Sequence, residues 1–442
     1  MTKILSGIVV RLYLANPCSQ SCSRLLKHPL YSILPVQTPI LMSTIQPTTG
    51  SERLEVIDAL RGSALFGILL ANLYSFMGYG AYTPEEIIGL PTLDRLVLFF
   101  IDWFVEGKFY GTFSILFGVG FALQAERFRS AGESFRSFWL RRMVVLICIG
   151  LIHMYFVWNG DILTLYGFLG IFLPLFLSFS NKALIRWIWV LLTIPLIIYA
   201  ILYLTQDASF WGSLQRVSAN LKAQWGYEDL SLLEMRTSNN PIEVCHFNIL
   251  AAIPRSMSYL LSGRYFHVMG LFLIGLVLAR NWLPKIRQKD ISVPRSAVLL
   301  GIIGLIFSFA YALTKWIMGT PFELSYMGIF QVVVYNIGST SLALGIAMLF
   351  VYLWASGKGD WVFKNLAILG RMALSNYIFQ NVTAVLLFFG YGLALMGKVP
   401  FAYLPLFAIG ILITQWALSR AWLSRFKQGP LEYIWRKLTY RS

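Results

Sequence analysis

Long apolar stretches restrict the fold of this chain more than any other feature of its sequence. A helix needs about 20 mainly apolar residues to cross a bilayer. Such stretches occur near residues 57–77, 96–124, 142–158, 162–178, 187–204, 257–279, 297–316, 326–354, 366–391 and 403–420. Only 13% of the residues are charged, about half the fraction of a soluble domain. We therefore expect an all-α, polytopic membrane helix bundle with about ten transmembrane helices and the lipid bilayer as its main partner.

The basic residues predict how this bundle is oriented. The chain has 36 Lys and Arg against 20 Asp and Glu, a net charge of +16. Because they are scattered between apolar stretches, they do not indicate a nucleic-acid-binding patch. They cluster in alternate loops: 127–142, 182–186, 280–295, 358–364 and 420–441. The positive-inside rule then places both chain ends in the cytoplasm.

Three segments fall outside the predicted spans. Residues 1–52 predict either a flexible extension or a misannotated start, with Met42 as the alternative first residue. Residues 53–442 then form the multi-pass membrane domain. Within it, 205–256 is too polar to span; we expect an extracytoplasmic loop with short interfacial helices, or a lid over an outward-facing cavity. The tail, 421–442, predicts a cytoplasmic amphipathic segment. The four cysteines suggest neither a disulfide framework nor a metal site.

Polar residues inside the apolar stretches are the candidate functional residues, because burying them in a membrane is costly. Asp58 and Arg61 are three residues apart on one helix face and can pair. The pair is either structural or a site where Arg61 holds a phosphate arriving from the cytosol. Asn72 lies about 21 Å further along the same helix, in the predicted outer half.

Two further pairs have both a functional and a structural interpretation. His153 ends one short span and Asp161 opens the next. A carboxylate beside an imidazole fixes its tautomer and raises its basicity, as a general base requires; alternatively, the pair only ties the helical hairpin together. Asn376 and Gln380 are four residues apart and share a face. They either bond neighbouring helices or line a polar cavity.

Several motifs together resemble one family of bacterial membrane proteins. They are Asp58-Ala-Leu-Arg61-Gly62, Phe113-Ser-Ile-Leu-Phe-Gly118, Arg141-Arg142 with His153, Gly160-Asp161-Ile-Leu, Gly370-Arg-Met-Ala-Leu-Ser-Asn376-Tyr377, and Gly429-Pro-Leu-Glu432. Taken in order, from about Arg53 to the end of the chain, they resemble the YeiB-like family, domain of unknown function 418. The resemblance implies a bacterial cytoplasmic (inner) membrane location. It implies no reaction.

The first-helix pattern is also distantly similar to membrane acyltransferases that use cytosolic acetyl-CoA. That similarity implies Asn72 at the reaction centre and Arg61 near the CoA. This sequence departs from the pattern of the lysosomal acyltransferases, in which a histidine follows soon after the asparagine. No histidine occurs in 73–95, so His153 would have to take its place.

Three functions are compatible with these observations. The first is an acyltransferase that uses acyl-CoA as co-substrate and an extracytoplasmic acceptor, with no permanently bound cofactor. His153 would be its base, Asp161 would orient the base, and Asn72 would steady the oxyanion; Asp58, Arg61, Asn376 and Gln380 would bind substrate. The second is a small-molecule transporter or permease, although the two halves show no convincing repeat. The third is a non-catalytic membrane component that binds a partner or a lipid.

Overall fold

The computed structural model describes residues 54–130, 134–206, 209–288 and 295–440, and in these residues all regular structure is helical. The predicted extension, 1–52, lies outside the described residues. The longer helices are α1 (Glu55–Phe76), α3 (Thr92–Phe104), α4 (Lys108–Ser130), α5 (Phe135–Phe156), α7 (Asn181–Thr205), α8 (Ser209–Gln224), α10 (Pro241–Leu261), α11 (Arg264–Gln288), α12 (Arg295–Met318), α13 (Tyr326–Ala355), α14 (Asp360–Arg371), α15 (Ala373–Phe388), α16 (Leu404–Leu423) and α17 (Pro430–Thr439). The short elements are η2 (Tyr79–Ala81), α2 (Pro84–Ile88), α6 (Leu163–Gly170), η3 (Leu173–Phe176), α9 (Leu232–Thr237) and η4 (Phe401–Tyr403).

Seven segments of the described chain are long and apolar enough to cross a membrane: Glu55–Ala81, Phe135–Phe156, Asn181–Thr205, Arg264–Gln288, Arg295–Met318, Tyr326–Ala355 and Phe401–Leu423. Their outward faces are apolar, since Trp189 on α7 is 68% exposed and Ile306 on α12 is 61% exposed. Exposed apolar helix faces of this length indicate contact with lipid rather than water. The predicted all-α membrane bundle is confirmed, whereas ten crossings and the cytoplasmic termini stay predictions.

Three predicted spans are divided in the structure. The stretch 96–124 is not one helix, because α3 ends at Phe104 and α4 begins at Lys108. The chain turns at Gly107, which has φ +84° and lies so close to α13 that a Cβ would be 2.9 Å from Ser339; a non-glycine residue there would be strained. The stretch 162–178 is α6 followed by η3, and 366–391 is divided at Met372 between α14 and α15.

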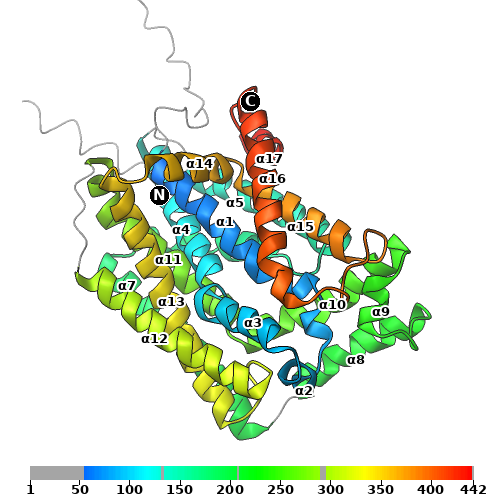
Figure 1. Cartoon of the computed structure of the whole chain (residues 1–442). Coiled ribbons are helices and arrows are strands. Elements are labelled where there is room, and N and C mark those ends of the chain that lie inside the picture. The colour runs from blue at the N-terminus through cyan, green and yellow to red at the C-terminus, as the bar shows by residue number, and fades with distance from the viewer. Residues whose placement is uncertain (1–53, 131–133, 207–208, 289–294, 441–442) are drawn as a thin grey trace, which may run out of the picture. The chain divides into compact units, whose positions relative to one another are not determined.

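Helix α1 lies in the middle of the bundle beside α4, α14, α15 and α16 (Figure 1). Its contact with α14 requires glycine on both sides. A Cβ on Gly62 would overlap the carbonyl oxygen of Leu366, and one on Gly370 would overlap that of Asp58. Small residues allow membrane helices to approach this closely. Gly118 of α4 makes a similar close approach, against the Phe272 carbonyl on α11.

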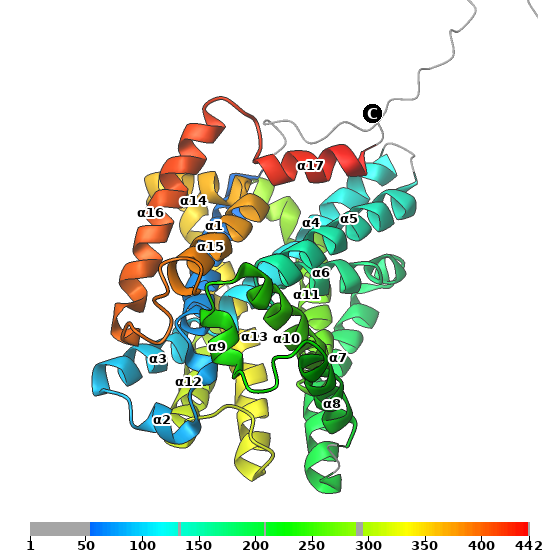
Figure 2. The same cartoon turned by 90° about the vertical axis from the view of Figure 1, so that its right-hand side faces the viewer.

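The two ends of the bundle differ in their elements (Figure 2). Helices α14 and α17 lie at one end, and α2 and α8 lie at the other. Following the predicted orientation, we name these the inner end and the outer end. The predicted loop 205–256 contains α8, α9 and most of α10, so this segment is helical, and its place outside the cytoplasm and along the interface stays a prediction.

Candidate functional site

A cavity of about 660 Å³ lies in the outer half of the bundle. It is bounded by the second half of α1, the break between α3 and α4, the turn after α5, and parts of α7, α10, α11, α13 and α15. Its size falls in the range of small-molecule sites. Helix α10, which begins inside the segment predicted as a loop, supplies one wall through Arg255, Ser258 and Tyr259.

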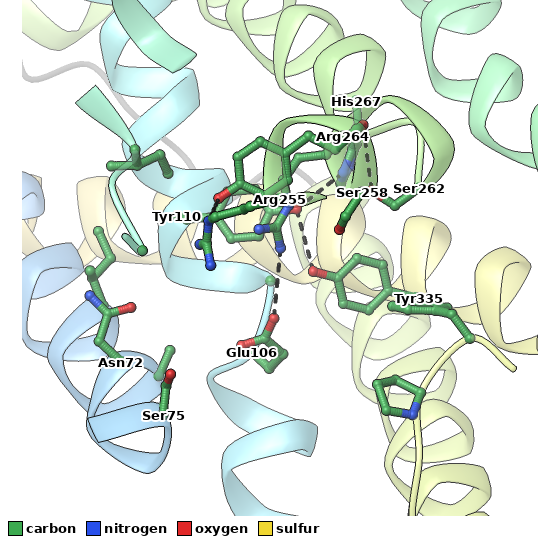
Figure 3. Close-up of a pocket in the computed structure, with 18 of the residues that line it drawn as sticks. Asn72, Ser75, Glu106, Tyr110, Arg255, Ser258, Ser262, Arg264, His267 and Tyr335 are labelled. Atoms are coloured by element: carbon green, nitrogen blue, oxygen red, sulfur yellow. Dashed lines mark hydrogen bonds and ion pairs between the residues drawn. The ribbon is translucent and has the colours of Figure 1, made fainter. Parts of the chain in front are cut away.

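Charged side chains from three elements point into this cavity (Figure 3). The Arg264 guanidinium on α11 lies 4.0 Å from the carboxylate of Glu106 in the α3–α4 break. It also lies 5.0 Å from the ring centroid of Tyr110. Arg255 on α10 donates from Nε to the Tyr259 hydroxyl at 2.9 Å. The described residues of the wall therefore include two guanidinium groups and one carboxylate.

A second polar group surrounds His267 on α11, which is 3% exposed. The Tyr110 hydroxyl is 3.2 Å from His267 Nδ1 and 3.4 Å from the Tyr335 hydroxyl (Figure 3). On its other side, His267 Nε2 is 2.9 Å from the Thr340 hydroxyl. Because both ring nitrogens have partners, this histidine is held in one orientation.

A chain of four polar side chains runs from the cavity wall into the bundle. Asn72 Nδ2 donates to Asn381 Oδ1 at 3.5 Å, and Asn381 Nδ2 donates to His153 Nε2 at 3.1 Å. His153 Nδ1 then donates to Asp161 Oδ1 at 3.0 Å. The second carboxylate oxygen accepts the backbone N–H of Thr164 at 2.7 Å. In this arrangement His153 is the Nδ1–H tautomer with its Nε2 lone pair directed toward Asn381.

The structure thus brings together three of the predicted site residues, and only Asn72 lines the cavity. The side chains of His153 and Asp161 are 1% and 0% exposed, behind Asn381 and Tyr377. The Tyr377 ring, which does line the cavity, has its centroid 5.3 Å from that of His153. The histidine is therefore one side chain away from the cavity.

The other predicted residues lie elsewhere. Asp58 and Arg61 pair at 3.1 Å near the inner end of α1. Arg61 lies against Gly120 of α4. Its positive charge and that of Arg436 both repel the positive charge of Arg142 on α5. This inner arginine group, Arg61, Arg142 and Arg436, concentrates positive charge at the inner end. The Arg142 guanidinium lies 3.6 Å from the ring centroid of Trp435, which fixes its position.

Neither Asn376 nor Gln380 of α15 is among the residues that line the cavity. Asn376 Nδ2 donates to the Leu369 carbonyl and to the Ser419 hydroxyl, both at 3.0 Å. Its own backbone carbonyl accepts from Gln415 on α16 at 2.7 Å. Gln380 is fully buried. The geometry of Asn376 matches the structural interpretation, in which amides bond neighbouring helices.

Several residues of this region did not enter the sequence prediction: Glu106 as a cavity residue, Tyr110, Arg255, Arg264, His267, Tyr335 and Asn381. Part of the signal was present. Arg264 and His267 are three residues apart inside the predicted span 257–279, so they share a helix face and are costly to bury. Arg255 and Tyr259 have the equivalent spacing of four.

Comparison with known proteins shows which proteins the chain is similar to. Residues 278–442 match the model of the protein of unknown function family DUF418. The chain is 29% identical over 417 residues to the uncharacterised protein YxaH of Bacillus subtilis (strain 168), covering 91% of this chain and 98% of that one. It is 26% identical over 411 residues to the uncharacterised protein YeiB of Escherichia coli (strain K12), covering 88% and 97%. No solved structure matches significantly. Residues 278–442 are therefore similar to the DUF418 family, and most of the chain is similar to YxaH and YeiB.

Proposed function

We propose that this protein transfers an acyl group from cytosolic acyl-CoA to an acceptor bound in the cavity. One observation carries the proposal: a buried histidine–carboxylate pair is joined through Asn381 to Asn72 on the cavity wall. Asp161 accepts the Nδ1 proton, so it holds His153 in the tautomer whose Nε2 can take a proton. The location in a bacterial cytoplasmic membrane is part of this proposal.

The proposed step is a base-assisted acyl transfer. The hydroxyl or amine of the acceptor replaces the Asn381 amide at Nε2, and its proton moves to His153 as its oxygen or nitrogen attacks the thioester carbonyl. The carbon–sulfur bond then breaks, and the imidazolium returns the proton to the departing CoA thiolate. The products are the acylated acceptor and free CoA. Asn72, which donates from its amide, is suited to stabilise the oxyanion.

The inner arginine group fits the other substrate. CoA carries phosphate groups, and guanidinium groups bind phosphate through paired N–H donors. Arg61, Arg142 and Arg436 place three such groups at the inner end, where cytosolic CoA would enter in the predicted orientation. These arginines support the binding of acyl-CoA, whereas the cavity in the outer half supports the binding of the acceptor.

The release of CoA thiol from acetyl-CoA, with water as the acceptor, tests this function. Purified protein in nanodiscs should release thiol above the protein-free rate. Asp161→Asn and His153→Ala should each lower that rate by about a hundredfold or more, since general base catalysis contributes that much. His246→Gln is the matched control, because His246 contacts Tyr227 and Trp225 away from the cavity. Wild-type protein that neither binds acetyl-CoA nor releases thiol would refute the proposal.

A transporter of small anions is the second candidate, and the divided helix at the cavity favours it. Val105, Glu106 and Gly107, which separate α3 from α4, line the cavity. Transporters often form substrate sites at such interruptions. Uptake of an anion into proteoliposomes without acyl-CoA would support transport. If this uptake persists in Asp161→Asn, transport does not require the residues proposed for acyl transfer.

A further inference from the structure

Arg255 is the residue that most restricts the chemistry of the cavity's ligand. Among the residues that the structure describes it makes no ion pair. Its contacts are the hydroxyl and ring of Tyr259 and, at 6.0 Å, the ring of Trp158. Glu106, the one carboxylate among the described residues of the cavity wall, lies against Arg264 instead. The described side chains of the wall therefore leave the Arg255 guanidinium charge without a neutralising partner.

A third arginine increases this positive charge. Arg236 on α9 donates to the Asn159 side chain at 3.3 Å and to the carbonyl of Ser75, a cavity residue, at 3.5 Å. It is close enough to Arg255 that the two like charges repel, and burial together with this repulsion lowers the pKa of Arg236 to about 10. Like charges that are brought together away from bulk water are costly, and a bound anion would offset that cost.

Aromatic side chains form a large part of the rest of the wall. Tyr74, Phe109, Trp158, Tyr259, Tyr335 and Tyr377 line the cavity. Aromatic rings offer flat apolar surface, and their tyrosine hydroxyls can also form hydrogen bonds. A ligand that matches both the arginines and this wall is amphipathic, with an anionic group at one end and an apolar or flat body.

We propose that the cavity binds a small organic anion, whose carboxylate or phosphate lies between Arg255 and Arg264 and whose body packs on the tyrosine and tryptophan rings. The inference rests on the proposed function in one respect: the anion is then the acyl acceptor, with a hydroxyl or amine facing Asn72. A soluble carboxylate and the phosphate of an anionic lipid headgroup share this chemistry.

Binding of a fluorescent carboxylate tests the inference. The full chain is placed in phosphatidylcholine nanodiscs without acyl-CoA and titrated with dansylglycine or with the neutral dansylglycinamide. Saturable binding of dansylglycine should weaken about tenfold or more in Arg255→Gln, because a charge-assisted hydrogen bond is lost. Arg216→Gln, on the exposed surface of α8, should leave it unchanged. Arg264→Gln should also weaken binding, and it serves as the second variant if Arg255→Gln does not fold.

Phosphatidylglycerol distinguishes the two sources of the anion. If its addition to the nanodisc displaces the probe from wild-type protein, the anion site takes a lipid headgroup; if it does not, the site takes a soluble anion. The inference would be overturned if wild-type protein bound dansylglycinamide as tightly as dansylglycine. It would also be overturned if Arg255→Gln and Arg216→Gln weakened dansylglycine binding equally. A third result would overturn it as well: dansylglycine shows no saturable binding, and phosphatidylglycerol binds equally well with and without Arg255. Because the binding assay contains no acyl-CoA, its result does not depend on whether the protein releases CoA thiol in the acyl-transfer assay.

Discussion

The ion pair between Asp102 on α3 and Lys315 on α12 allows a quantitative prediction about the membrane interior. Lys315 Nζ is 2.7 Å from Asp102 Oδ1, and both side chains are 7% exposed. Beside the pair, Lys108 Nζ donates to the Asp102 backbone carbonyl at 2.6 Å. This group connects α3 and α12 to the break that carries Glu106 and Gly107 into the cavity wall, so its loss is expected to affect both stability and the cavity.

The magnitude follows from the separation and the burial. At 2.7 Å with an effective dielectric constant of about 20, the attraction is about 6 kcal/mol, and the desolvation of both ions offsets much of it. Removing one partner leaves a buried charge and should cost about 3–5 kcal/mol. Asp102→Asn should be the more damaging variant, because it leaves the buried Lys315 without the carboxylate of its ion pair and beside the positive charge of Lys108. Lys315→Met leaves Asp102 near Lys108.

A double-mutant cycle measures the coupling. Unfolding by sodium dodecyl sulfate in mixed micelles can be followed by the fluorescence of the 14 tryptophans. The double variant Asp102→Asn/Lys315→Met should lie closer to wild type than either single variant, so the coupling should exceed the larger single loss and reach about 3–5 kcal/mol or more. Asp360→Asn at the exposed start of α14 should change stability by less than about 0.5 kcal/mol. A double variant whose loss equals the sum of the single losses would refute the reasoning.

Three further predictions concern the inner end, the central helix contact and the polar chain. Glu432 on α17 accepts the Ser375 hydroxyl at 2.5 Å and the Leu374 N–H at 2.7 Å, and burial raises its pKa above the ordinary 4.5. Its contribution to stability is therefore complete below pH 4.5 and decreases as the pH rises through the raised pKa. As the pH rises from 4.5 through that pKa, the melting temperature of wild type should fall relative to that of Glu432→Gln. A melting temperature that rises instead would contradict the direction of the pKa shift. Gly370→Ala forces a Cβ onto the Asp58 carbonyl and should lower the unfolding free energy by about 1–3 kcal/mol or more. The control is Gly410→Ala, which should be neutral or slightly stabilising because its Cβ would meet no atom within 4 Å. Asn381→Leu should cost about 1–3 kcal/mol, because it leaves His153 Nε2 without its donor; an unchanged melting temperature would show that the chain of four side chains is not coupled.

The sequence by itself determined the features that depend on local composition. Apolar length predicted the membrane helices, since the bilayer accepts few charges over about 20 residues. Spacing along one helix predicted the Asp58–Arg61 pair, which the structure contains at 3.1 Å. The short turn after α5 brought His153 and Asp161, eight residues apart, within 3.0 Å. Each of these follows from residues that are neighbours in the chain.

Only the tertiary structure decided which distant polar groups meet. Asn381, the partner of both His153 and Asn72, is 228 and 309 residues away from them. The break at Gly107 depends on the close approach of α13, and the cavity exists because α10 and α11 bring Arg255 and Arg264 to the helix interruption. Hydropathy predicts that a segment is buried in lipid, but it does not encode the rotation of each helix about its axis or its register against its neighbours. Those two quantities decide which polar side chains face one another, and packing over the whole bundle sets them.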